Sequence, residues 1–231
     1  STDTPLTSCE VEPKPLPEEI DFLLKHAARY LTKDPTREDL LSMFAGVRPL
    51  VTNPDAENTA AISREHVVSI SDSGLVTIAG GKWTTYRKMA EDTLDQAIAV
   101  GELDFKPCVT ADIHIHGYHQ HTENFGSLAV YGSDALEIRN LAEREPELNQ
   151  KIHPLFDYTK AEVIWGVREE MAFTVADFLS RRTRGLLLDA KASLEMAPVV
   201  AELMMQELKK DQRWKQAQIA SFTELAENCI V

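Results

Sequence analysis

The chain has 231 residues, of which 43% are hydrophobic, so it is long enough to bury a core in one large domain or two small ones. Its formal net charge of −13 argues against a nucleic-acid-binding protein and against broad electrostatic docking on anionic lipid. It does not exclude an anionic small substrate, because local basic groups can outweigh a remote net charge. The three cysteines form no CxxC pair, and no run of about 18 apolar residues occurs, so neither a disulfide framework nor a membrane-spanning helix is predicted.

Two helices are predicted in the first 46 residues. Pro17 suits the first turn of a helix, and the apolar residues that follow it recur at helical spacing as far as Leu31. A second helix is predicted to open at Thr36, with Asp39 as its capping-box partner, and to stop near Gly46.

Four short segments rich in β-branched or alternating residues are predicted as strands: 47–51, 65–71, 74–80 and 109–117. Pro49 limits the pairing of the first strand, and Asp72-Ser73-Gly74 forms the turn between the second and the third. A helix of about four turns is predicted after the third strand, ending at Gly101.

From about residue 122 the strand signals disappear and helical periodicity replaces them. Five helices are predicted there: 133–145, 159–172, 174–182, 187–209 and 211–228. Thr159 with Glu162, and Thr174 with Asp177, resemble capping-box starts. The fold class is therefore predicted as an α+β part followed by an all-α part. The corresponding predicted domains are 1–120 and 121–231.

The stretch GGKWTT, residues 80–85, comes directly before the predicted four-turn helix. Its two glycines allow a sharp turn and the close approach of another backbone or a flat ligand. The first N–H groups of the following helix lack intrahelical acceptors and carry partial positive charge, Lys82 adds a full charge, and the threonines can cap. This combination suits an anion or a polar ring edge that gains negative charge. The alternative is an ordinary Gly-Gly turn with a capped helix and a solvated lysine.

Two arginines come before this stretch. Arg48 lies inside an apolar predicted strand, where its guanidinium needs a carboxylate or phosphate partner; a structural ion pair is the alternative to a functional role. Arg64 lies at a strand start, where a surface role is equally compatible. Together with Lys82, these arginines could converge on one dianion.

The other motifs are weaker. His114 and His116 would share a strand face, but only Asp112 lies nearby as a further ligand, so no metal site is predicted and an exposed loop cluster is favoured. The basic stretch SRRTRG, residues 180–185, is predicted to pair with carboxylates and to favour a helix C-terminus. The chain contains no GxSxG, HExxH, P-loop or GxGxxG motif, so any dinucleotide would need a pyrophosphate cradle from elsewhere.

The segments STDTP, FAGVRPLV, ISREHVVSISDSGLVTIAGGKWTTYRKMAEDT and FLSRRTRGLLLD resemble, in this order, the C-terminal half of FAD-dependent, respiratory, quinone-linked glycerol-3-phosphate dehydrogenases. The resemblance implies the last part of an FAD-binding domain and a substrate domain with a mixed sheet over residues 1–120, then a helical C-terminal cap over residues 121–231. Because the chain begins with Ser1 rather than Met, we expect a fragment whose dinucleotide cradle lies upstream. Mitochondrial members carry calcium-binding loops after the cap, and the lack of such a loop here implies a bacterial protein.

The resemblance also implies an activity for the full-length protein. It would oxidise sn-glycerol 3-phosphate to dihydroxyacetone phosphate and pass electrons through FAD to quinone, as a homodimer bound peripherally to the inner face of the bacterial cytoplasmic membrane. The fragment alone is expected to be inactive, because half of the flavin site is absent. Two alternatives stay open: an oxidase that uses oxygen, and a non-enzymatic helical interaction module. No nucleic-acid partner is expected.

Residue roles follow from the resemblance, position by position. Arg48 and Lys82 are implied as catalytic residues, and Arg64 joins them in binding the substrate. Five residues are implied at the flavin ring: Gly80, Gly81, Lys82, Trp83 and Thr84. An arginine and a histidine that the family uses upstream have no counterpart in this chain.

Overall fold

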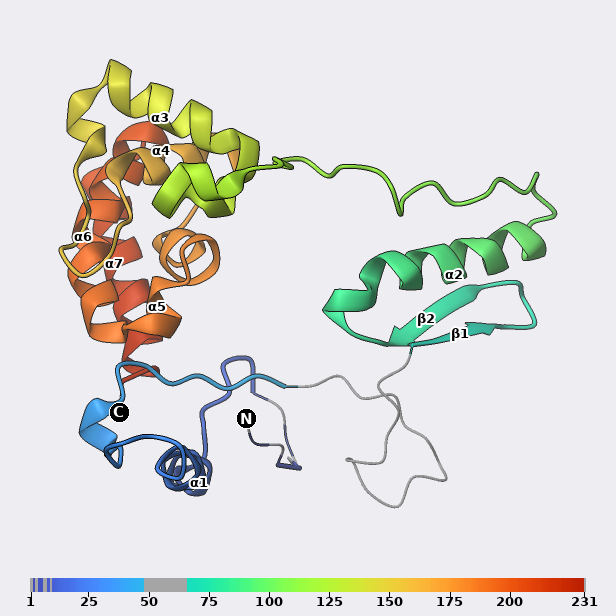
Figure 1. Ribbon diagram of the computed structural model, residues 1–231, viewed down its shortest axis with the longest axis horizontal. Coiled ribbons are helices and arrows are strands. Elements are labelled where there is room, and N and C mark those ends of the chain that lie inside the picture. Colours follow the sequence, from blue (N-terminus) through green and yellow to red (C-terminus); the bar gives the residue numbers. More distant parts are fainter. Residues whose placement is uncertain (1, 3, 6–7, 9, 48–65, 231) are drawn as a thin grey trace. The chain divides into compact units, whose positions relative to one another are not determined.

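The computed structural model of the chain describes residues 2, 4–5, 8, 10–47 and 66–230. These residues form two compact units: a helical unit, made of residues 10–46 and 117–230, and a hairpin–helix unit, made chiefly of residues 66–116 (Figure 1). The predicted strand at 47–51 falls almost wholly outside the described residues, and Arg48 and Arg64 lie outside them. The division of the complete protein into domains near residue 120 stays a prediction.

The hairpin–helix unit contains the two predicted strands, which are confirmed. Strands β1 (His66–Ile70) and β2 (Val76–Gly80) pair antiparallel, with His66 opposite Gly80 at the open end of the hairpin. Gly74 adopts a φ of +82° in the turn between them, where its N–H donates to the carbonyl oxygen of Ser71 at 2.9 Å. The hairpin therefore forms where turn chemistry and β-branched residues both predict it.

Helix α2 (Tyr86–Val100) follows the hairpin, as predicted, and ends at Gly101, whose N–H donates to the carbonyl oxygen of Ala97 (Figure 1). It lines, together with β2, an open apolar groove of about 410 Å³ whose walls include Ile78, Tyr86 and Leu94. No residue of β1, β2 or α2 is fully buried within the part of the chain that the structure describes. The described part of this unit thus has an apolar face but no closed core.

The strand predicted over residues 109–117 is wrong. The segment forms turns and irregular backbone, and its apolar side chains Ile113 and Ile115 are 57% and 71% exposed. A strand needs a neighbour that completes its ladder of hydrogen bonds, and no described segment pairs with this one. Alternating polarity was therefore not sufficient to make a strand here.

The helical unit contains, in chain order, α1 (Pro17–Ala27), the 3₁₀ turn η1 (Arg37–Asp39), the 3₁₀ stretch η4 (Thr122–Asp134), α3 (Ala135–Arg144), η5 (Pro146–Asn149), α4 (Lys160–Glu169), the π-helical turn η6 (Asp177–Arg182), α5 (Gly185–Leu188), α6 (Ala190–Glu207) and α7 (Gln212–Glu227). Its core packs around the fully buried side chains of Phe178, Met196, Met204 and Phe222. The predicted fold class, α+β followed by helical, is confirmed.

Local capping signals were reliable in this unit. Glu162 accepts hydrogen bonds from the N–H of Thr159 at 2.6 Å and from its hydroxyl at 3.0 Å, which confirms the capping box at the start of α4. At the second predicted start, the Asp177 carboxylate accepts from the Thr174 N–H at 2.9 Å, and the Thr174 hydroxyl accepts from the Asp177 N–H at 3.1 Å. Each of these two helix starts depends on hydrogen bonds between residues three positions apart, so the sequence pattern was sufficient to predict it.

Two predicted helices differ in their interior. The helix predicted over 174–182 widens into η6, a π-helical turn, after two α-helical residues. The helix predicted over 187–209 breaks at Asp189, whose extended backbone separates α5 from α6. The Asp189 carboxylate accepts from the N–H of Ala192 at 2.9 Å, so it caps α6 instead of continuing a helix.

The helix predicted from Thr36 to Gly46 is wrong beyond its first turn. The capping box of Thr36 and Asp39 forms, but only η1 follows it. Residues 41–43 instead make three hydrogen bonds to helix ends: the Leu41 carbonyl accepts from Ala190 N at 3.1 Å, the Ser42 hydroxyl donates to Leu186 O at 2.6 Å, and Met43 N donates to Cys229 O at 2.9 Å. Backbone groups at helix ends lack intrahelical partners, so this extended segment satisfies them and is held in place by them.

Glu162 is a charged side chain inside the helical unit, only 3% exposed. Besides its capping bonds, it accepts a hydrogen bond from the Tyr131 hydroxyl at 3.1 Å. Burial raises the pKa of the Glu162 carboxyl above its ordinary value of 4.5, and burial likewise raises the pKa of Tyr131. The folded protein therefore holds a proton on Glu162 to a higher pH than the unfolded chain does.

A raised folded-state pKa makes this contribution to stability fall as the pH rises above 4.5. We predict that Glu162→Gln, which preserves the capping box, flattens that fall and leaves the protein more stable than wild type at pH 8. Glu162→Ala should cost about 1–3 kcal/mol because it leaves buried donors without acceptors. Urea unfolding between pH 4 and pH 8 tests both, with exposed Glu224→Gln on α7 as control. A pH profile for Glu162→Gln that matches wild type would contradict this account.

Candidate functional site

The turn between β2 and α2 is built on two glycines with left-handed backbone. Gly80 has φ +75° and Gly81 φ +79°, a region that L side chains rarely adopt. A Cβ atom on Gly81 would lie 2.5 Å from the sulfur of Met89 on α2 and 3.3 Å from the Cβ of His66 on β1. A side chain at this position would therefore require the flexible end of Met89 to move aside and the His66 Cβ to shift by a few tenths of an ångström, and it would also have to adopt a strained φ.

Lys82 follows in extended conformation and opens the short 3₁₀ turn η3 (Trp83–Thr85), which continues directly into α2. The Thr85 hydroxyl accepts from the Lys82 N–H at 3.3 Å and donates to the Lys82 carbonyl at 3.0 Å. The predicted capping role of the threonine pair is thus confirmed for Thr85. These bonds hold the backbone of Lys82, while its side chain is exposed to solvent.

The surface of this turn presents polar groups that have no partners among the described residues. Lys82 is exposed and has no acidic partner among the described residues, and the N–H groups of Trp83 and Thr84 meet no acceptor there. Trp83 is 85% exposed and stacks on Tyr86, with ring centroids 5.6 Å apart. A free cation, unpaired N–H donors and an exposed aromatic ring are suited to an anionic or electron-accepting planar ligand.

Of the predicted site residues, the structure brings together the five on this turn: Gly80, Gly81, Lys82, Trp83 and Thr84. Arg48 and Arg64 lie outside the described residues, so their convergence with Lys82 stays a prediction. The described residues contain no group of three or more His, Cys, Asp or Glu side chains placed to hold a metal.

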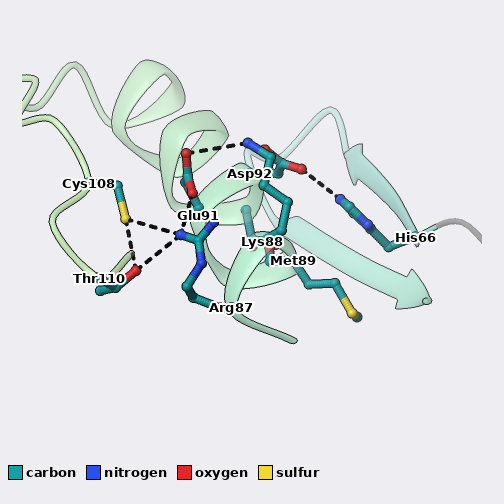
Figure 2. A network of polar contacts seen from close by, with 9 residues as sticks. His66, Arg87, Lys88, Met89, Glu91, Asp92, Cys108 and Thr110 are labelled. Atoms are coloured by element: carbon teal, nitrogen blue, oxygen red, sulfur yellow. Dashed lines mark hydrogen bonds and ion pairs between the residues drawn. The ribbon is translucent and has the colours of Figure 1, made fainter. Parts of the chain in front are cut away.

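A polar network that was not predicted runs along α2, beside this turn (Figure 2). Asp92 accepts from His66 Nε2 at 2.9 Å through one carboxylate oxygen and pairs with Lys88 at 2.8 Å through the other. The hydrogen bond from Lys88 is the main cause that holds the pKa of Asp92 below its ordinary value, and His66 adds to it. Asp92 therefore links β1 to α2 as a carboxylate.

The network continues toward the loop after α2 (Figure 2). Glu91 pairs with Lys88 at 3.3 Å and with Arg87 at 2.6 Å, and Arg87 also donates to the Thr110 hydroxyl at 3.3 Å. The four members on α2 are Arg87, Lys88, Glu91 and Asp92, and their ion pairs join residues three or four positions apart. This spacing is visible in the sequence. The bond from His66 to Asp92 joins residues 26 positions apart, and no local pattern indicates it.

The basic stretch SRRTRG has the structural role that was predicted. Arg181 pairs with Asp177 at 2.9 Å, and Arg182 donates to the carbonyl oxygen of Glu170 at the end of α4. A guanidinium at this position satisfies an orphan carbonyl and interacts favourably with the helix dipole. These two arginines therefore stabilise the helical unit.

Comparison with known proteins identifies the family. The family described as "C-terminal domain of alpha-glycerophosphate oxidase" matches residues 76–217, from β2 into α7. The chain belongs to this family. The match includes the whole Gly80–Thr84 turn and most of the helical unit, and it confirms the resemblance to FAD-dependent glycerol-3-phosphate dehydrogenases.

The similar proteins are named glycerol-3-phosphate dehydrogenases. The mitochondrial glycerol-3-phosphate dehydrogenase of Macaca fascicularis is 40% identical over 243 residues, covering 95% of this chain and 33% of its own length. That of Arabidopsis thaliana is 34% identical, covering 96% of this chain and 40% of its own. A glycerol-3-phosphate dehydrogenase from Bacillus halodurans, solved in complex with FAD, matches the fold with a TM-score of 0.76 at 25% identity, over 100% of this chain and 48% of its own. This chain thus spans a third to a half of the length of these relatives.

The packing around Gly81 yields a prediction about stability. Gly81→Ala adds a Cβ 2.5 Å from the Met89 sulfur at a φ of +79°, whereas Gly74→Ala has a similar φ but an ordinary contact of 3.6 Å with Val100. We expect Gly74→Ala to cost about 1 kcal/mol from backbone strain alone, and Gly81→Ala to cost about 1 kcal/mol more, because the flexible end of Met89 can move aside but the His66 Cβ, 3.3 Å from the added Cβ, must shift. Melting temperatures of the two variants measure the difference. Equal losses would show that Gly81 is not confined by its neighbours.

Proposed function

We propose that this chain is the C-terminal portion of an FAD-dependent enzyme that oxidises sn-glycerol 3-phosphate to dihydroxyacetone phosphate. The proposal is carried by one observation: similarity to glycerol-3-phosphate dehydrogenases extends over 95% of the chain and includes the turn with its free cation. The activity belongs to the complete protein, because the chain spans only part of its relatives.

The residues present fit one edge of a flavin. Gly80 and Gly81 allow a flat ring to approach the backbone, and the N–H groups of Trp83 and Thr84 point to no protein acceptor within the described part of the chain. FAD, when bound, supplies the acceptor for a hydride from the substrate. Lys82 and the unpaired N–H groups of Trp83 and Thr84 would stabilise negative charge at that edge. The two N–H groups are held by the backbone of η3, so they need little reorganisation as charge develops.

The substrate would be held by the arginines. A planar guanidinium binds phosphate through two parallel hydrogen bonds, so Arg48 and Arg64 are suited to grip the phosphate of glycerol 3-phosphate. Arg48 and Lys82 would then lie closest to the reacting carbon and are proposed as catalytic residues. In this arrangement the chain supplies substrate contacts and one edge of the flavin site, and the upstream part of the protein supplies the pyrophosphate cradle.

Quinone is proposed as the electron acceptor, and the family description points to oxygen as the alternative acceptor. Residues 76–217 match the domain of an oxidase, for which oxygen is the acceptor. We further propose a homodimer that binds the inner face of a bacterial cytoplasmic membrane peripherally; among the described residues, no helix has the length and apolar content needed to cross a membrane. The bacterial assignment stays a prediction, and the relatives of 34–40% identity described above are mitochondrial.

Turnover by the full-length protein tests the proposal. With FAD bound, it should oxidise glycerol 3-phosphate with a soluble quinone analogue and release little peroxide, whereas the isolated 231 residues should show no turnover. Peroxide formed in proportion to substrate consumed would favour the oxidase. Turnover by the isolated chain, or none by the full-length protein, would contradict the proposal.

A further inference from the structure

The turn between β2 and α2 is part of a closed circuit of chain and hydrogen bonds. His66, the first residue of β1, pairs with Gly80, the last residue of β2, in the hairpin register. The chain then passes through Gly81 and η3 into α2, where the Asp92 carboxylate accepts a hydrogen bond from His66 Nε2 at 2.9 Å (Figure 2). The bond between His66 and Asp92 therefore closes a circuit in which the turn is one side.

The turn needs such a restraint because it begins with two glycines. Glycine adopts positive and negative φ at similar cost, so Gly80 and Gly81 permit the observed backbone without enforcing it. No residue of β1, β2 or α2 is fully buried within the described part of the chain, so no closed apolar core holds the helix against the hairpin there. The bond between His66 and Asp92 therefore restrains the direction in which α2 leaves the turn.

Several features make this bond stiff. The His66 and Asp92 side chains are only 21% and 32% exposed, so solvent competes weakly for it. The other carboxylate oxygen of Asp92 pairs with Lys88 at 2.8 Å, and Lys88 also pairs with Glu91 at 3.3 Å (Figure 2). A carboxylate restrained on both oxygens loses little further freedom when it accepts from the imidazole, so this pair is stiffer than an isolated surface pair.

The same turn carries the groups that are proposed to meet the flavin. Lys82 is exposed, and the N–H groups of Trp83 and Thr84 have no acceptor among the described residues. All three belong to the segment that joins the hairpin to α2, so a change in the angle between these elements displaces them. Donors of this kind stabilise developing charge only when they are already in place before the reaction.

We propose that His66 and Asp92 are positioning residues for the flavin edge, acting by holding the turn that carries Lys82 at a fixed angle to the hairpin. This inference rests on the proposed function and adds two residues to it. Neither side chain needs to touch the flavin. Because the interaction between charges weakens with distance, the effect of Lys82 on the flavin should depend on the bond between His66 and Asp92.

The chain offers matched variants and controls. His66→Asn breaks the bond because the shorter amide does not reach Asp92, whereas His66→Gln restores a donor near the position of Nε2. Gly74→Ala strains the opposite end of the same hairpin, where φ is +82°, and so controls for a general loss of stability in this unit. His153→Asn removes a histidine–carboxylate pair of similar length, 3.0 Å to Glu195, from the helical unit.

The experiment uses the full-length protein and measures the dissociation constant of FAD and the two-electron reduction potential of bound FAD. We expect His66→Asn and Asp92→Leu each to weaken FAD binding about tenfold, and the double variant to bind no more weakly than either alone. Lys82→Met should change the potential less than about half as much in the His66→Asn protein as in wild type. His66→Gln should restore both properties, and Gly74→Ala and His153→Asn should leave both unchanged.

The inference is overturned if His66→Asn binds FAD as tightly as wild type, or if Gly74→Ala weakens binding equally. It is also overturned if Lys82→Met changes the potential by the same amount in the His66→Asn protein as in wild type, because the bond then does not position the turn. If Asp92→Leu does not fold, the comparison of His66→Asn with His66→Gln decides. Failure of the wild-type full-length protein to bind FAD contradicts the proposed function itself, which distinguishes the two failures.

Discussion

The absence of a side chain at Gly81 is the constraint on which the arrangement of the turn depends. Gly80 and Gly81 both have positive φ, which L side chains rarely adopt, and a Cβ on Gly81 would lie 3.3 Å from the His66 Cβ and 2.5 Å from the Met89 sulfur. The path of the turn between β2 and α2 therefore depends first on this backbone conformation, and the neighbouring side chains leave little space beside it. Lys82, the next residue, therefore has a defined backbone position, and the hydrogen bond from its N–H to the Thr85 hydroxyl helps to hold it.

The hairpin–helix unit contrasts with the helical unit in how it is stabilised. The helical unit has a buried core around Phe178 and Met204, together with bonds that close the ends of its helices. The hairpin–helix unit has no fully buried residue in β1, β2 or α2 and relies on β pairing, Gly81 and the polar network along α2. Its apolar groove and its N–H groups without acceptors among the described residues are what we expect of a surface that other parts of a longer protein would cover, as in the proposed function.

The features that the sequence predicted well are local. The capping boxes at Thr159 and Thr174, the hairpin turn at Gly74 and the basic C-terminal residues of the stretch 180–185 all act over a few residues, so spacing reveals them. The Gly-Gly-Lys turn was likewise visible, because positive φ demands glycine and a helix start follows.

The features that were missed depend on distant partners. The segment after Thr36 has a sound capping box, yet Leu41 and Met43 do not continue a helix. Their backbone groups form hydrogen bonds with Ala190 and Cys229 at helix ends far away in the sequence. Residues 109–117 alternate like a strand, but a strand exists only with a neighbour. The hydrogen bond between His66 and Asp92 joins a strand to a helix, and no pattern in a single sequence predicts a contact between residues so far apart.

The central claim is that the Lys82 ammonium faces the edge of a bound flavin where negative charge develops. The two-electron reduction potential of FAD in the full-length protein tests it directly, since a fixed cation favours the reduced, more negative ring. Lys82→Met should lower the potential by roughly 30 mV or more, which corresponds to a tenfold change in the equilibrium. Lys106→Met, an exposed lysine outside the turn, should leave it unchanged. A Lys82→Met protein that binds FAD normally and retains the wild-type potential would contradict the account.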